Sequence, residues 1–241
     1  MARFLQYKFI LPTATAIVST TNITIPDGGV VNAILPISGS LSNGSGGANI
    51  IGTGSVRSAT ITAGGNASAI EFTITGLQNG GSVTIGPIAG PDSTTSDTKV
   101  YFDVITSITY SAANATGNPV VYNNISIGIG KSGFLPLVLI NLLESTSDLD
   151  YTFSIFGVAP DALDYTVDVY GALSNVYNNG SSYENLISSY AVIQTPTLSP
   201  IDDTDMIVPV FASEALQYLL FKFTIEGIEN PQLFNFQFLQ V

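Results

Sequence analysis

Cysteine, histidine and tryptophan are all absent from the 241 residues of this chain. Without cysteine the chain has no disulfide, no thiolate nucleophile and no thiolate metal ligand, and without histidine it has no imidazole ligand and no Ser-His-Asp triad. Most hydrolase chemistry is thereby excluded. Paired carboxylates, a tyrosine or a lysine are the only groups left for catalysis. A stable fold must come from packing and from hydrogen-bonded sheet, and we expect no enzyme and no cofactor.

Charged residues are also scarce, at 10% of the chain against roughly 25% in ordinary globular domains. The net charge is −12 and is unevenly distributed. Up to Ile140 five basic residues balance five acidic ones, whereas thirteen acidic residues and only Lys222 follow. A neutral part and an acidic part indicate an assembly surface at one end and a solvent-facing surface at the other. The basic residues that we take as interface candidates are Arg3, Lys8, Arg57 and Lys131.

Nucleic acid and membrane are not expected as partners. Phosphate binding needs clustered lysine and arginine, which this chain lacks. No stretch reaches the roughly 18 to 20 consecutive apolar residues of a membrane-spanning helix, and the nearest, FLPLVLINLL, has a proline inside it. Near the N-terminus, Lys8 and Pro12 interrupt the apolar run that a signal peptide requires, so we expect none.

What the chain does contain is a recurring alternation of apolar and polar residues, as in TNITI, SATIT, EFTITG, NNISIGIG, DYTVDVYG, LLFKFTIEG and LFNFQFLQV. This period of two, with β-branched and aromatic residues between Gly, Asn, Asp or Pro, is typical of strands. In EFTITG we expect Phe72 and Ile74 on one face and Glu71, Thr73 and Thr75 on the other. The pattern predicts an all-β fold, an antiparallel β-sandwich or jelly roll in two lobes, over residues 1–142 and 143–241.

The sequence also predicts the turns and loops between the strands. Positive-φ turns are expected at 26–29, 79–81 and 178–180, where Asn, Asp and Gly gather. A short helix is expected at most near 213–217. The longest low-complexity stretch, 38–54, is either an exposed flexible loop or an arm that becomes ordered against a neighbouring subunit.

The sequence ISIGIGKSG, residues 125–133, contains the GKS triplet of a phosphate-binding loop. The glycine that should open that motif is Ile125, and Gly133 and Pro136 follow where a helix should begin. We therefore interpret the stretch as a strand that runs into a glycine turn. Lys131 is then either an ion-pair donor between subunits or a solvated lysine on a turn.

Three further groups of residues are weak site candidates. Asp202, Asp203 and Asp205 would offer oxygen ligands to calcium but lack the EF-hand spacing, so a solvated acidic turn is the alternative. Either this cluster or a second one, at Asp161, Asp164 and Asp168, is a remote candidate for a catalytic carboxylate pair. Tyrosines that could stack on sugars, or simply pack on strands, gather in one segment: Tyr165, Tyr170, Tyr177, Tyr183 and Tyr190. Six Asn-x-Ser/Thr sequences also occur, at Asn22, Asn43, Asn66, Asn114, Asn124 and Asn179.

The order of the segments resembles a family of virion structural proteins of tailed bacteriophages. The likeness begins in TATAIVSTTNITIPDGGVVNAI, is strongest over 57–76, 86–108 and 121–133, and returns in LLFKFTIEGIENPQLFNFQFLQV. Residues 161–200 depart from it. The resemblance implies a building block of the virion, assembled in the host cytoplasm, with other virion proteins as partners.

From these features we expect a non-enzymatic capsid decoration or cement protein that forms a symmetric oligomer on the head, with a trimer matching a threefold site. A protein of the tail, the neck or a fibre base is the closest alternative. A carbohydrate-binding β-sandwich module is a more remote one.

Overall fold

The computed structural model describes residues 2–9, 12–51, 56–134, 140–141, 150–157, 164–172, 191–194, 197–198, 206–211, 218–226 and 232–240, and the side chains of 12–51, 56–133 and 222. Every pair of neighbouring strands whose register is given is antiparallel, and the described residues contain no helix. The predicted all-β, antiparallel character is therefore confirmed for this part of the chain. The expected short helix near 213–217 lies outside the described residues.

The chain divides into two compact units. One, here the N-proximal unit, comprises Pro12–Gly52 and Arg57–Gly130, and the other, the C-proximal unit, comprises Met1–Leu11, Thr53–Val56 and Lys131–Val241. The first eleven residues thus belong with the C-terminal part of the chain, whereas the division expected from the sequence placed them in 1–142. Whether either unit folds as an independent domain stays a prediction.

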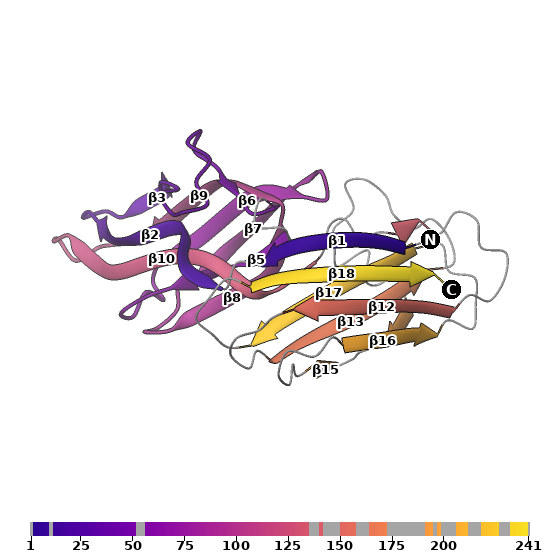
Figure 1. Ribbon diagram of the computed structural model, residues 1–241. Helices are drawn as coiled ribbons and strands as arrows, with labels where there is room; N and C mark the ends of the chain where they lie inside the picture. The colour runs from indigo at the N-terminus through magenta and orange to yellow at the C-terminus, as the bar shows by residue number, and fades with distance from the viewer. Residues whose placement is uncertain are drawn as a thin grey trace. The chain divides into compact units, whose positions relative to one another are not determined.

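In the C-proximal unit the first and last strands of the chain lie side by side (Figure 1). β1 (Ala2–Phe9) pairs with β18 (Gln232–Gln240), which also pairs with β12 (Asp150–Gly157), and β12 pairs with β16 (Met206–Phe211). A second group of strands surrounds β17 (Tyr218–Glu226), which pairs with β13 (Asp164–Ala172) and β11 (Ile140–Asn141). Two short strands, β14 (Ala191–Gln194) and β15 (Thr197–Leu198), pair with β13.

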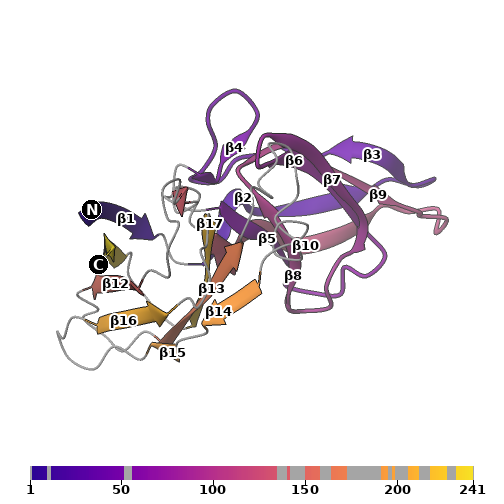
Figure 2. The same cartoon turned by 90° about the vertical axis from the view of Figure 1, so that its right-hand side faces the viewer.

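The N-proximal unit contains strands of two sheets (Figures 1 and 2). In one, β10 (Val120–Phe134) lies between β2 (Thr13–Ile25) and β5 (Val56–Thr62), and β5 pairs with β8 (Thr95–Phe102). In the other the order is β3 (Val30–Ile34), β9 (Val104–Ala112), β6 (Glu71–Gln78) and β7 (Gly81–Ala89), with the short β4 (Ala48–Asn49) on β9. The last residues of β10 belong to the C-proximal unit, where Ser132 and Gly133 pair with β17.

Turn chemistry follows the sequence closely in this unit. Asn79 and Gly80, between β6 and β7, have φ values of 49° and 79°, so both occupy the left-handed region that a two-residue hairpin turn needs. Gly28 and Gly29, between β2 and β3, have φ values of 85° and 81°. Both predicted turns are confirmed, and the third, at 178–180, lies outside the described residues.

Buried and exposed side chains alternate along β6 but not along the central parts of β5 and β10, and the hydrophobic core explains this difference. On β6, Phe72 and Ile74 are buried and Glu71 is exposed, which confirms the predicted faces. A Cβ on Gly76 would lie 2.8 Å from Cδ1 of Phe102, a buried residue at the end of β8, so β6 and β8 approach each other closely at this point. On β5, residues 56–61 are all buried, and so are 125–130 of β10. These two strands are therefore covered on both faces, whereas β6 is covered on one.

The low-complexity stretch was expected to be a flexible loop or an intersubunit arm. Over residues 38–51 this expectation is wrong. They pack against the same unit: the N–H of Leu41 donates to Ala16 O of β2 at 2.8 Å, and the N–H of Ile51 donates to Asp103 O at 2.8 Å. Ala48 and Ile50 are buried. A Cβ on Gly39 would collide with the backbone of Ala16, so small residues serve close backbone approach here.

The structure confirms the strand predicted at the GKS triplet but not the glycine turn predicted to follow it. β10 continues as a strand through 131–134, so these described residues form no turn. A strand at this point is incompatible with the strand–loop–helix geometry of a phosphate-binding loop. The glycines serve packing instead, because a Cβ on Gly128 would lie 2.6 Å from Cα of Ala14 on β2 and closer still to Thr13 O.

The close approach of β2 to β10 yields the first prediction. Gly128→Ala forces a methyl group into the backbone of β2, which cannot move away without breaking the β2–β10 pairing. We expect a loss of about 2–3 kcal/mol in the free energy of unfolding, measured by urea denaturation. Gly65→Ala is the matched control, because a Cβ there meets nothing within 4 Å, and its stability should stay within about 0.5 kcal/mol of the wild type. Equal stabilities for the two variants would contradict this account of the packing.

Candidate interaction surface

Four connections of the N-proximal unit gather at one end of it, here called the loop end: residues 26–29, 63–70, 90–94 and 113–119. Backbone hydrogen bonds join them in pairs. The N–H of Ala67 donates to Pro91 O at 3.0 Å and that of Ser93 donates to Gly65 O at 3.0 Å, which ties 63–70 to 90–94. The N–H of Gly28 donates to Asn114 O at 2.7 Å, which ties the β2–β3 turn to the β9–β10 connection. The loop end is thus a built surface rather than a set of separate loops.

The side chain of Asn114 holds two connections of this end together, which we call its fastening role. Its side chain is buried, and Nδ2 lies 2.9–3.1 Å from the carbonyl oxygens of Ile25, Pro26 and Asn118. Its Oδ1 accepts from the N–H and from Oγ1 of Thr116, at 3.1 and 2.8 Å. One side chain therefore satisfies backbone groups from both connections that it joins.

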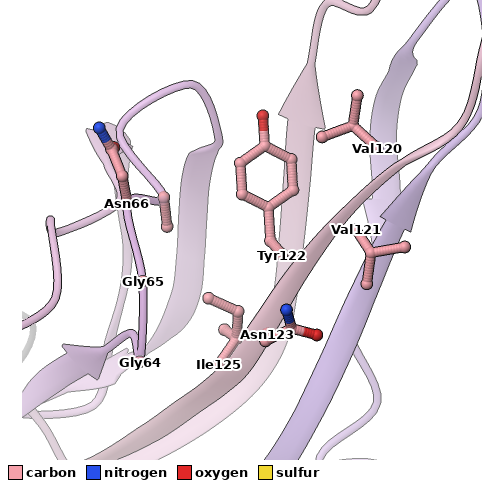
Figure 3. A pocket seen from close by; sticks show the side chains of 9 residues that line it. Gly64, Gly65, Asn66, Val120, Val121, Tyr122, Asn123 and Ile125 are labelled. Carbon is pink, nitrogen blue, oxygen red and sulfur yellow. The ribbon is translucent and has the colours of Figure 1, made fainter.

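Two hollows lie on either side of the 63–70 connection. The smaller, of about 270 Å³, is bounded by residues 64–67 and by the first residues of β10, and the ring of Tyr122 stands in it (Figure 3). The larger, of about 570 Å³, lies between the start of β3, residues 68–71 and the end of β9. Neither is lined by a basic residue, and Glu71 in the larger hollow is the only acidic lining residue of the two.

The strand β3 is an edge of its sheet and carries the most exposed large apolar side chains of the described residues. Val31 is 82% exposed and Ile34 is 75% exposed. The pairing with β9 is irregular between Val30 and Ala33, where Asn32 has a φ of 51° and its N–H donates to Ser111 Oγ at 2.9 Å. An exposed apolar edge strand is a contact surface that must be covered or that favours association.

Arg57, an interface candidate from the sequence, is not on the surface. It is 0% exposed, and its Nε donates to Gly130 O on β10 at 2.9 Å, as does Nη2. Burial lowers the pKa of Arg57 to about 10, and the attraction of Asp97 partly opposes this. The guanidinium is therefore still charged at neutral pH, and its hydrogen bonds to Gly130 O join β5 to β10.

The other predicted residues are placed less fully. Lys131 is exposed at the end of β10, and Arg3 and Lys8 lie on β1 opposite Phe238 and Leu233. A role of these three basic residues at an interface stays a prediction. Asp164, Asp168, Tyr165 and Tyr170 lie on β13, where Asp168 is opposite Lys222. The remaining candidates lie outside the described residues: Asp161, Tyr177, Tyr183, Tyr190, Asp202, Asp203 and Asp205.

Three of the Asn-x-Ser/Thr sequences have a structural explanation. In each, the Asn Oδ1 accepts from the N–H two residues ahead: Ser45 to Asn43 at 2.9 Å, Ser68 to Asn66 at 2.9 Å, and Thr116 to Asn114 at 3.1 Å. This side-chain turn needs the same residue types at the same spacing as a glycosylation sequence. The burial of Asn114 could not be predicted for this reason, because the residue pattern fits an exposed glycosylation sequence and a buried side-chain turn equally well.

Comparison with known proteins adds no relative: no family model matches the chain, and neither a curated protein nor a solved structure matches it. Within the described residues, no group of three or more acidic side chains could hold a metal ion. Among these same residues no helix is long and apolar enough to cross a membrane. The described loop end offers amide, hydroxyl and backbone hydrogen-bonding groups together with the carboxylates of Asp27 and Asp92, and β3 offers apolar contact.

The fastening role of Asn114 gives the second prediction. Asn114→Ala leaves the carbonyl oxygens of Ile25 and Pro26 without their side-chain donor, and we expect a loss of about 2–3 kcal/mol in the free energy of unfolding by urea denaturation. Asn118→Ala, in the same connection but with an exposed side chain, is the control and should change stability by less than about 0.5 kcal/mol. A cost for Asn118→Ala as large as that for Asn114→Ala would refute the fastening role.

Proposed function

We propose that this chain is a non-enzymatic virion structural protein, most concretely a capsid decoration or cement protein that assembles as a symmetric oligomer on the head. The resemblance of its segments to virion proteins of tailed bacteriophages supports the virion role. The observation that carries the assembly role is the exposed apolar edge β3, with Val31 and Ile34 almost fully open to solvent. The partners are further copies of the chain and the major capsid protein, in the virion.

The occupant of this edge is a second copy of the chain. The N-proximal unit carries two basic and five acidic residues, a net charge of −3, so the repulsion between two copies of it is small compared with that expected from the net charge of −12 of the whole chain. Low charge and exposed valine and isoleucine are compatible with the core of an intersubunit contact. A closed ring of three copies satisfies one such contact per copy and matches a threefold site on a shell.

At the level of architecture, we propose that the N-proximal unit is a sandwich of two antiparallel sheets of jelly-roll type. The support is the buried face of β6, which approaches Phe102 of the other sheet through Gly76. Such a body stays rigid without disulfides when both sheets bury their inner faces.

A structural protein of the tail, the neck or a fibre base is the alternative, since the same rigid, edge-exposing unit suits those positions. The acidic part of the chain, beyond Ile140, is proposed to face solvent in either case.

The third prediction concerns assembly. Placing two carboxylates on β3 in the double variant Val31→Asp/Ile34→Asp puts unpaired charge into the contact and removes its apolar area. We expect the recombinant wild-type chain to be oligomeric, with a trimer as the leading state, and the double variant to be monomeric by native mass spectrometry. The folded state should be retained, because both side chains are exposed.

The control for added charge is Ser82→Asp, an exposed residue of β7 at the opposite edge of the same sheet, which should leave the oligomer intact. Quantitative mass spectrometry of purified particles tests the virion role separately. A copy number on the order of hundreds per particle would support head decoration, and about six or twelve copies would indicate the neck or tail. Absence from particles would overturn the virion role, and a monomeric wild type would overturn the β3 contact.

A further inference from the structure

We propose that the smaller hollow of the loop end, around Tyr122, is a binding subsite for one neutral pyranose ring of a glycan. This inference is independent of the virion role. It also concerns a different part of the chain from the tyrosines of 165–190, which the sequence offered as stacking residues.

The hollow presents an aromatic ring that the strand has turned out of the core. Tyr122 is half-buried and lies opposite Ile23 of β2, and the β2–β10 register shifts between Tyr122 and Ile125. Asn124, inside this irregularity, has a φ of 55°. A bulge re-aims the side chains next to it, and here Tyr122 stands between residues 64–66 and Val120 (Figure 3). One face of a tyrosine ring in an open hollow is a platform on which the C–H face of a sugar can stack.

Two glycines give the hollow its depth. A Cβ on Gly64 would lie 2.7 Å from Cβ of Asn124, so glycine lets this connection approach β10 closely, and the N–H of Gly64 donates to Asn124 O at 3.2 Å. At Gly65 the situation is opposite, because a Cβ there meets nothing within 4 Å. Gly65 therefore borders open space that a ligand can occupy without displacing protein atoms.

The polar groups of the hollow are neutral amides. Asn66 and Asn123 line it, and the lining contains no charged side chain. Oδ1 of Asn66 accepts from the N–H and Oγ of Ser68, at 2.9 and 2.7 Å, which holds the amide and leaves Nδ2 as its donor. Asn123 is exposed on β10. Amides offer both donors and acceptors to hydroxyl groups, whereas an ionic ligand would find no counter-charge. These features favour a neutral, polyhydroxylated ligand.

The size of the hollow limits the ligand and its affinity. A volume of about 270 Å³ is at or just below the lower end of ligand sites, which suits a single sugar ring rather than a chain. For a ligand of about a dozen non-hydrogen atoms we expect a Kd on the order of 1–10 mM. A symmetric oligomer that carries several such subsites would bind a polysaccharide more tightly through avidity.

The experiment is saturation-transfer NMR on the full recombinant chain with the methyl glycosides of glucose, galactose and mannose and with N-acetylglucosamine, beside glucuronic acid as the charged comparison. We expect at least one neutral sugar to bind, with glucuronic acid weaker. Tyr122→Ala should weaken that binding at least about tenfold, and Tyr122→Phe, which keeps the ring, should retain it within about threefold.

Two further variants keep the test decisive if Tyr122→Ala does not fold. Gly65→Leu places a side chain in open space at the hollow, so it should abolish binding while leaving the Tm close to that of the wild type. Tyr110→Ala, which truncates another half-buried tyrosine outside the hollow, should leave binding unchanged. The proposal is overturned if no neutral sugar binds, if only the charged sugar binds, or if binding survives Gly65→Leu.

Discussion

The pair of hydrogen bonds from Arg57 to the carbonyl oxygen of Gly130 is the interaction on which the rest of the N-proximal unit depends. It joins β5 to β10 where both strands are buried on both faces, and it places a positive charge in a chain that has very few. A buried charge is tolerated only when its donors are satisfied. Gly130 must be glycine for a steric reason, since a Cβ there would meet Ser58 Oγ and lie 2.8 Å from Asp97 Oδ2. The central strands are thereby fixed against each other, and the loop end is built on their continuations.

Much of this fold could be predicted from the sequence, because strand alternation and turn chemistry are local properties. The faces of β6 and the turns at 26–29 and 79–80 followed from residue type and spacing alone. Burial of Arg57 could not be predicted, since a single basic residue in a strand says nothing of the carbonyl that will receive it. The 38–51 segment was misjudged because the small residues of a flexible linker are also those that permit close backbone packing. Similarly, Asn114 could not be distinguished from an exposed glycosylation sequence before the turn around it was known.

The candidate surface illustrates the same limit. Val31 and Ile34 belong to the short segment VVNAI, and only the sheet order shows that this strand is an edge with its apolar side chains exposed. The hollow at Tyr122 depends on a register shift in β10 that the local pattern of residue types does not predict. The apolar edge of β3 and the uncharged hollow at Tyr122 are the two contact surfaces that we propose for the N-proximal unit. Assembly through β3 and sugar binding at the smaller hollow would use different residues of the same unit.

Native-state hydrogen exchange, followed residue by residue by NMR, tests most directly whether β5 and β10 are the foundation of the unit. We predict that the slowest-exchanging amides within 57–61 and 125–130 open only by global unfolding, with a free energy equal to that from urea denaturation. Amides of β3 and of the exposed turns should exchange through smaller, local openings. If instead the amides of β5 and β10 opened at a free energy well below that of global unfolding, the central pair would not be the element that holds the unit together.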